Sequence, residues 1–242
     1  MATDRAGYRL KDQFDQEVLG YLTGFKQATL SANAGTARVA ADKSGTDPIA
    51  GAAANGLLAS MLIARNSFVS GGAATDSIAT HADGSTGEAT PLEVLNRMAR
   101  LLDQQNVDRD GRWGVVDPVF AEQLNDENSK LLNNDFSSGN TDILRNGRII
   151  SGLIRGFRVY MSNNLPSVGT GPATIDTNGS SAHYGAIVAG HDSAVATASQ
   201  IEKVESYRDN DSFADIVRGM HLYGRKVLRP EALVRAHYNI AG

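Results

Sequence analysis

From Gln200 to Asn239 the chain reads QIEKVESYRDNDSFADIVRGMHLYGRKVLRPEALVRAHYN, which contains two strand-like runs joined by a polar turn and a third run after a proline. The runs 201–207 and 213–228 carry apolar and charged residues on both faces, so each predicts a strand of a thin sheet with little interior. The turn Arg208–Asp211 separates the two runs. Such strands make a poor core for one subunit and a natural surface for neighbouring ones.

The run that follows Pro230 predicts one further strand, because its residues alternate with a period of two. Its two faces are formed by Ala232, Val234, Ala236 and Tyr238 on one side and by Arg235, His237 and Asn239 on the other.

The composition is ordinary for a soluble globular protein, with 242 residues of which 41% are hydrophobic and 21% charged. No apolar run approaches the roughly 18 to 20 residues that span a bilayer. The first residues, MATDRAGYRLKDQ, lack the apolar stretch of a signal peptide, so we expect synthesis inside the cell. The absence of cysteine excludes disulfides, thiolate metal ligands and a cysteine nucleophile. A net charge of -4 argues against tight nucleic-acid recognition and leaves a loose, non-specific contact open.

Two helices are predicted, one from the periodicity of its apolar residues and one from its capping sequence. Apolar residues recur every three or four positions from Thr3 to about Phe25, which indicates a long amphipathic helix whose last turns are weakened by Gly20 and Gly24. The sequence Thr90-Pro91-Leu92-Glu93 is a capping box with proline at the first helical position, and it predicts a helix that continues to about Gln105.

The remaining elements mix helices and strands without a repeating βα unit, so the fold class is predicted to be α+β. In chain order, the pattern predicts a helix at Ile49–Ile63, a surface loop at Gly71–Thr90, a strand at Trp113–Val116, a helix from Asp117-Pro118 through Leu124, a strand pair around Ile149–Met161, a loop at Ser167–Ser181, a buried strand at Tyr184–Ala189 and a short helix at Asp192–Ser199.

The most site-like pattern is the sequence from Asn106 to Gly111, which resembles the opening of a calcium-binding EF-hand loop. An EF-hand needs a bidentate glutamate at the twelfth position, where this chain has Asp117 followed by a proline. We therefore favour a polar turn in which Gly111 has a positive φ, with calcium binding as the alternative.

No other pattern predicts a cofactor, a metal site or catalysis. The five histidines are scattered and no nucleophile elbow is present. Ser180, Ser181 and His183 are neighbours in sequence, but they fit a loop better than a catalytic triad. We expect the chain to have no cofactor and not to be an enzyme.

The order of these pieces resembles the major capsid protein of tailed bacteriophages, with the Hong Kong 97 type of fold. The helix at Thr3–Phe25 resembles the spine helix of that family. The segment Leu92–Leu124 is similar to its helix, turn, strand and proline-led helix, and Gly152–Pro166 to its strand pair. The family also places an N-terminal arm and a hairpin loop before the spine helix, whereas this sequence starts near the spine, so we assign no cross-linking residue.

The resemblance implies a spine helix, a peripheral domain and an axial domain. Residues 1–45 would hold the spine helix and the start of the peripheral domain, 46–199 mainly the axial domain, 200–229 the peripheral-domain strands and 230–242 the returning axial strand.

The implied function is structural. Identical subunits would assemble in the host cytoplasm into hexamers and pentamers of an icosahedral shell, the virion capsid, around double-stranded DNA that they touch non-specifically. Scaffold, portal and decoration proteins are further partners that the family suggests, and no membrane contact is expected. We hypothesise that Arg208, Asp209, Asp211, Arg218 and Arg225 form ion pairs between subunits around the threefold region.

Three other functions stay open. An encapsulin-like nanocompartment shell would share the fold and enclose an enzyme in place of a genome. A hydrolase would use Ser181, His183 and an aspartate. A calcium-binding module would use the loop at Asn106–Gly111.

Overall fold

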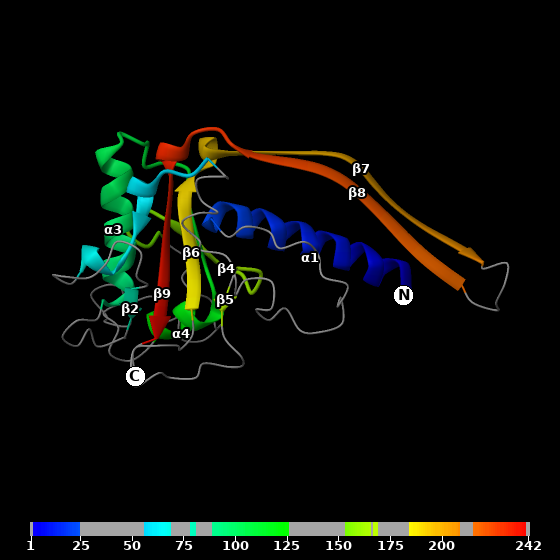
Figure 1. Ribbon diagram of the computed structural model, residues 1–242, viewed down its shortest axis with the longest axis horizontal. Coiled ribbons are helices and arrows are strands. Elements are labelled where there is room, and N and C mark those ends of the chain that lie inside the picture. Colours follow the sequence, from blue (N-terminus) through cyan, green and yellow to red (C-terminus); the bar gives the residue numbers. More distant parts are fainter. Residues whose placement is uncertain are drawn as a thin grey trace.

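Figure 1 shows the computed structural model of the chain, in which residues 2–24, 56–68, 78–80, 89–125, 153–165, 167–168, 184–208 and 215–240 are described. These residues form a body of sheet and helices, from which a long two-stranded hairpin projects with helix α1 running beneath it (Figure 1). The predicted α+β class is confirmed.

The described part of the body is built on a seven-stranded mixed sheet in the order β1-β9-β6-β3-β4, with β2 also paired to β9 and β5 to β6. Antiparallel pairs join β9 to β6, β6 to β3 and β6 to β5, and parallel pairs join β9 to β1 and β2 and β3 to β4. The strands are β1 (Leu62–Ile63), β2 (Ile78–Thr80), β3 (Arg112–Val116), β4 (Arg158–Met161), β5 (Ser167–Val168), β6 (Tyr184–His191) and β9 (Leu233–Ile240).

Strand β9 lies inside this sheet and is buried on both faces. The alternation predicted from the sequence is present, but residues 232–238 are all buried, including the polar Arg235 and His237. One face packs its apolar side chains into the core, where the rings of Tyr238 and Phe120 meet edge to face. On the other face His237 Nε2 lies 3.0 Å from the carbonyl oxygen of Thr23, at the end of α1.

Helices α3 (Pro91–Gln104) and α4 (Pro118–Leu124) begin as their sequences predict. The Thr90 hydroxyl accepts from Glu93 N and the Glu93 carboxylate accepts from Thr90 N, which completes the capping box. Asp117 caps α4 by accepting from Phe120 N at 3.1 Å. Both helices contribute fully buried side chains to the core, among them Leu95, Met98, Leu102, Phe120 and Leu124.

Helix α1 (Ala2–Thr23) confirms the predicted amphipathic helix, which continues through Gly20. It ends where Gly24 adopts a φ of 88°, a conformation that glycine takes at little cost. Asn164, in the turn after β4, donates to Asp12 at 2.9 Å and so fixes the helix to the body.

The hairpin consists of β7 (Val195–Arg208) and β8 (Asp215–Val227), paired antiparallel with an irregularity between Ser199 and Ile201. Both strands were predicted, but β7 starts earlier than expected. The short helix predicted at Asp192–Ser199 is wrong beyond a single 3-10 turn, Asp192–Ala194, because residues from Val195 onward pair with β8.

Three further predictions are corrected. In the predicted helix Ile49–Ile63, the described residues form a 3-10 turn at Ala59–Met61 and strand β1, whose backbone pairs with β9. The predicted loop Gly71–Thr90 contains β2, which also pairs with β9. Around Ile149–Met161, β4 is the only strand in the described part, and its partner is β3 across the sheet.

Candidate functional site

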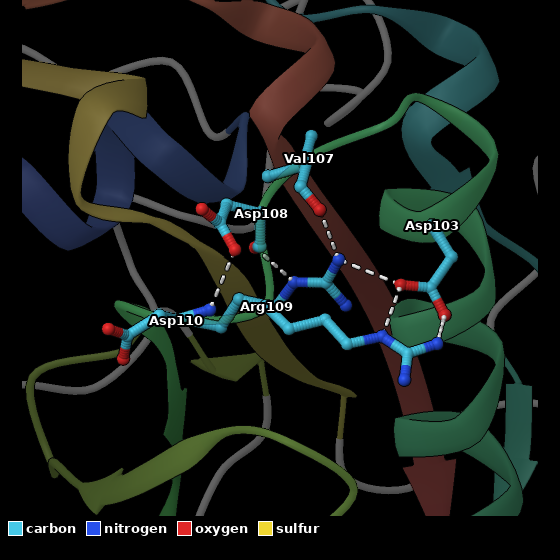
Figure 2. A network of polar contacts seen from close by, with 6 residues as sticks. Asp103, Val107, Asp108, Arg109 and Asp110 are labelled. Carbon is cyan, nitrogen blue, oxygen red and sulfur yellow. Dashed lines mark hydrogen bonds and ion pairs between the residues drawn. The ribbon is translucent and has the colours of Figure 1, made fainter.

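The EF-hand-like loop is a hydrogen-bonded turn, shown in Figure 2. Arg112 donates to Asp103 Oδ1 at 2.8 Å and to the carbonyl oxygen of Asp108 at 2.7 Å. Arg109 donates to the other oxygen of Asp103 at 3.1 Å. Hydrogen bonds from Arg112 and Arg109 hold the pKa of Asp103 below its usual range. Gly111 has a φ of 78°, as the polar-turn interpretation predicts.

The carboxylate at the twelfth position of the loop has another role. Asp117 is buried, caps α4 and accepts a hydrogen bond from the Tyr238 hydroxyl. Burial and the neighbouring Asp117 charge raise the pKa of Tyr238, so this hydroxyl keeps its proton and donates. Among the described residues no group of three or more histidine, aspartate and glutamate side chains could hold a metal ion. Asp117 is therefore a structural residue, and sequence spacing alone could not reveal its partner 121 positions away.

The residues of the hydrolase alternative, Ser180, Ser181 and His183, lie outside the described residues. Within the described part, no helix is long and apolar enough to cross a bilayer.

The remaining candidate is the hairpin, which we call the arm (β7 and β8). Its side toward α1 is packed. Phe14 of α1 lies 4.8 Å from the Tyr223 ring, edge to face, and 5.4 Å from the His221 ring, measured between ring centroids. His221 and Tyr223 belong to one parity of β8, together with Arg225, so this side of the strand faces α1 over these residues.

Arg225 connects the arm to α1 by charge. Its Nη1 donates to Glu17 Oε2 at 2.8 Å, and its guanidinium carbon lies 5.2 Å from the ring centre of Tyr21. The side chains of Arg225 and Glu17 are only 16% and 14% exposed, so the pair is largely removed from water. The structure thus places Arg225, one of the predicted subunit-contact residues, in a contact within its own chain.

The opposite side of the arm is exposed, and we call it the outer face (Lys203, Tyr207, Arg218, Met220 and Leu222). Tyr207, Met220 and Leu222 are 46%, 55% and 51% exposed. Glu205 accepts from Arg218 at 3.0 Å and also pairs with Lys203. Arg218 lies over the Tyr207 ring at 5.1 Å. The hydrogen bonds to Lys203 and Arg218 lower the pKa of Glu205, so the cluster stays charged at neutral pH.

The predicted contact residues are thus spread over the arm. Arg218 is on the outer face, Arg225 faces α1, and Arg208 is exposed at the far end of β7. Asp209 and Asp211 lie outside the described residues. A role of these five residues in ion pairs between subunits stays a prediction. The sequence did not predict Glu17 as the partner of Arg225, because nothing in the spacing of the two residues links them.

The chain is similar to solved structures from bacteriophages. It matches a structure from Mycobacterium phage Che8 with 31% sequence identity and a TM-score of 0.52, over 73% of this chain and 55% of that one. It also matches the capsid of Ralstonia phage GP4 with 13% identity and a TM-score of 0.57, over 98% of this chain and 66% of that one. The chain therefore spans about half to two thirds of the length of these structures. No protein-family model and no curated protein matches it.

These matches confirm the resemblance to phage capsid proteins that the sequence predicts. The two matched structures are described as a phage and a phage capsid, without a fold type. The Hong Kong 97 type of fold therefore stays a prediction.

Proposed function

From the fold that it shares with phage capsid structures, we propose that this chain is a subunit of a tailed-phage major capsid protein, which assembles with identical copies into the shell of the virion. The subunits would form hexamers and pentamers of an icosahedral lattice that encloses double-stranded DNA. The role is structural, with no catalytic turnover.

The observation that carries this proposal is the arm. It projects from the body with α1 beneath it, and its outer face leaves Tyr207, Met220 and Leu222 exposed (Figure 1). Apolar side chains exposed on one face and bordered by polar residues are typical of a surface that contacts another protein. A shell needs repeated contacts of this kind, each modest, whose sum over many copies gives a stable container.

The domain division follows the same proposal. Helix α1 would be the spine, the arm would belong to the peripheral domain and the seven-stranded sheet to the axial domain. The arm begins at Val195, so we move the boundary of the peripheral strands from residue 200 to residue 195. Strand β9 would then be the returning axial strand.

The further partners are also part of the proposal. Scaffold, portal and decoration proteins would act during assembly in the host cytoplasm, and packaged DNA would be touched without sequence preference. A net charge of -4 fits a loose contact better than a tight one.

The nanocompartment alternative is less favoured, because the two matches described above are phage structures. Calcium binding through the loop at Asn106–Gly111 is disfavoured by the structural role of Asp117.

Electron microscopy of the expressed full-length protein tests the proposal. Closed, hollow particles tens of nanometres across are expected. A monodisperse monomer that forms no particles with or without a co-expressed scaffold would contradict it, and esterase activity in that monomer would revive the hydrolase. Particles that contain a co-purified enzyme and no nucleic acid would favour the nanocompartment.

A further inference from the structure

The outer face of the arm and the surface beside the root of the arm differ in charge. The outer face carries Lys203 and Arg218 around one carboxylate, Glu205, and Lys226 is exposed on the same side nearer the body. Residues of β8 with even numbers share this side, because β8 alternates with a period of two. Two cations, Lys203 and Arg218, share the single carboxylate of Glu205, so the outer face carries a net positive charge beside its apolar side chains.

An acidic surface lies at the root of the arm, and we call it the acidic corner (Asp108, Asp110 and Asp192). All three residues are exposed. The loop of Asp108 and Asp110 adjoins Asp192, since Asp192 N donates to the carbonyl oxygen of Gly111 at 3.3 Å. Asp108 and Asp110 belong to the loop that resembles the opening of an EF-hand.

Among the described residues, the two arginines at the acidic corner are each paired with another carboxylate. Arg109 pairs with Asp103, and Arg229 pairs with Glu231. An exposed apolar side chain, Leu228, follows β8 at the same root. The corner therefore offers negative charge beside an apolar residue, which complements the outer face.

The two surfaces of one chain are too far apart to meet. Lys203 lies nine positions beyond Ala194, which at about 3.3 Å per residue is roughly 30 Å along an extended, paired strand. The arm would have to fold back on itself to close this gap, and its pairing with β8 prevents that. Within the described part of the chain, the acidic corner therefore does not reach the outer face of its own arm.

We propose that the outer face of the arm binds the acidic corner of a second copy of this chain. The inference rests on the proposed function, since it names the contact through which shell subunits meet. The contact is heterologous, because the two surfaces differ, so it can repeat from copy to copy around a ring or along a lattice. Lys203 and Arg218 meet Asp108, Asp110 and Asp192, and Met220 and Leu222 meet Leu228.

Charge exchange between the two surfaces tests this contact. One variant carries Lys203→Glu and Arg218→Glu, a second carries Asp108→Lys and Asp110→Lys, and a third carries all four changes. All four side chains are exposed, so the fold should persist, and circular dichroism and the melting temperature verify it. Arg100→Glu, on the exposed side of α3, is a matched control for a change of surface charge.

We expect each double variant to associate at least about tenfold more weakly than the wild type in sedimentation at low salt, and the fourfold variant to recover most of the loss. Arg100→Glu should associate as the wild type does. The contact is refuted if both double variants associate normally, or if the fourfold variant recovers nothing.

A second measurement separates this inference from the proposed function. The chain has no cysteine, so Met220→Cys combined with Leu228→Cys introduces the only thiols. Mild oxidation should link copies into a ladder on a non-reducing gel. If the wild type forms particles, but the double-cysteine variant gives no ladder and charge reversal has no effect, the contact is refuted and the shell function stands. A wild type that never forms particles would refute the shell function, and sedimentation would still decide whether the contact exists.

Discussion

Replacing Arg235 with methionine should stabilise the isolated chain. Arg235 is 2% exposed at the centre of the sheet, and its Nε has no hydrogen-bond partner among the residues that the structure describes. Burial lowers the pKa of its guanidinium to about 10. That value is about 2.5 below the ordinary arginine pKa, which corresponds to about 3 kcal/mol of unfavourable free energy for the charged form.

Methionine keeps the unbranched stem of Arg235 and removes the charge. Because replacing a buried charge by an apolar residue of similar volume is often stabilising, we expect the free energy of unfolding to rise by about 1 to 3 kcal/mol. The upper end requires that the neighbours of Arg235 repack around the shorter side chain without a cavity.

The gain should also depend on pH. At pH 7 the guanidinium is protonated in both the folded and the unfolded chain, so the full cost is present. Above pH 10 the folded chain releases this proton while the unfolded chain keeps it, so the wild type recovers stability as the pH rises. The difference between variant and wild type should be constant from about pH 7 to 9 and shrink above pH 10.

Urea unfolding at low protein concentration measures the effect, with fluorescence of Trp113, the single tryptophan, as the signal. Arg229→Met is the matched control. Arg229 is 48% exposed and pairs with Glu231, so its replacement should change stability by no more than about 0.5 kcal/mol. A loss of more than about 1 kcal/mol in Arg235→Met at pH 7 would refute the reasoning, since Arg235 would then contribute stabilising contacts.

Three more changes test other parts of the structure. Tyr238→Phe removes the hydroxyl that donates to the buried Asp117 and should lower the unfolding free energy by about 1 to 3 kcal/mol in urea; an unchanged midpoint would contradict this contact. Thr90→Ala breaks the capping box of α3 and should cost about 1 kcal/mol, seen as a lower melting temperature, whereas Thr90→Ser should cost little. Arg225→Met leaves Glu17 without its largely buried partner, so amide hydrogen exchange in β8 should accelerate at the root of the arm while β6 stays protected; equal protection in variant and wild type would argue against the coupling of arm and helix.

Local signals were sufficient for the elements that depend on neighbours in the sequence. The capping box predicted α3, the Asp-Pro pair predicted α4, and runs with apolar and charged residues on both faces predicted both strands of the arm. The half-polar faces of these strands also predicted that the arm would be exposed, and Tyr207, Met220 and Leu222 confirm it. Each of these features follows from contacts within a few residues or from the pattern on one strand.

Long-range pairing decided the rest. The apolar run that ends at Ile63 reads as a helix, but its last residues pair with β9, which lies far along the chain. Val195 reads as part of a short helix, but it pairs with Val227 and extends the arm. The same holds for the arm, since Arg225 pairs with Glu17 only because the arm lies over α1.

The amino-acid order by itself determined the long amphipathic helix, the capped helices, the thin charged strands and the likeness to phage capsid proteins, because these depend on local periodicity and composition. Only the tertiary structure decided that β9 buries Arg235 and His237, that Asp117 serves Tyr238, and that one side of the arm stays open. The physical reason is that burial and hydrogen-bond partners depend on which distant segments cover a residue. Period-two alternation predicts which side chains share a face of a strand, but it does not predict which segment packs against that face.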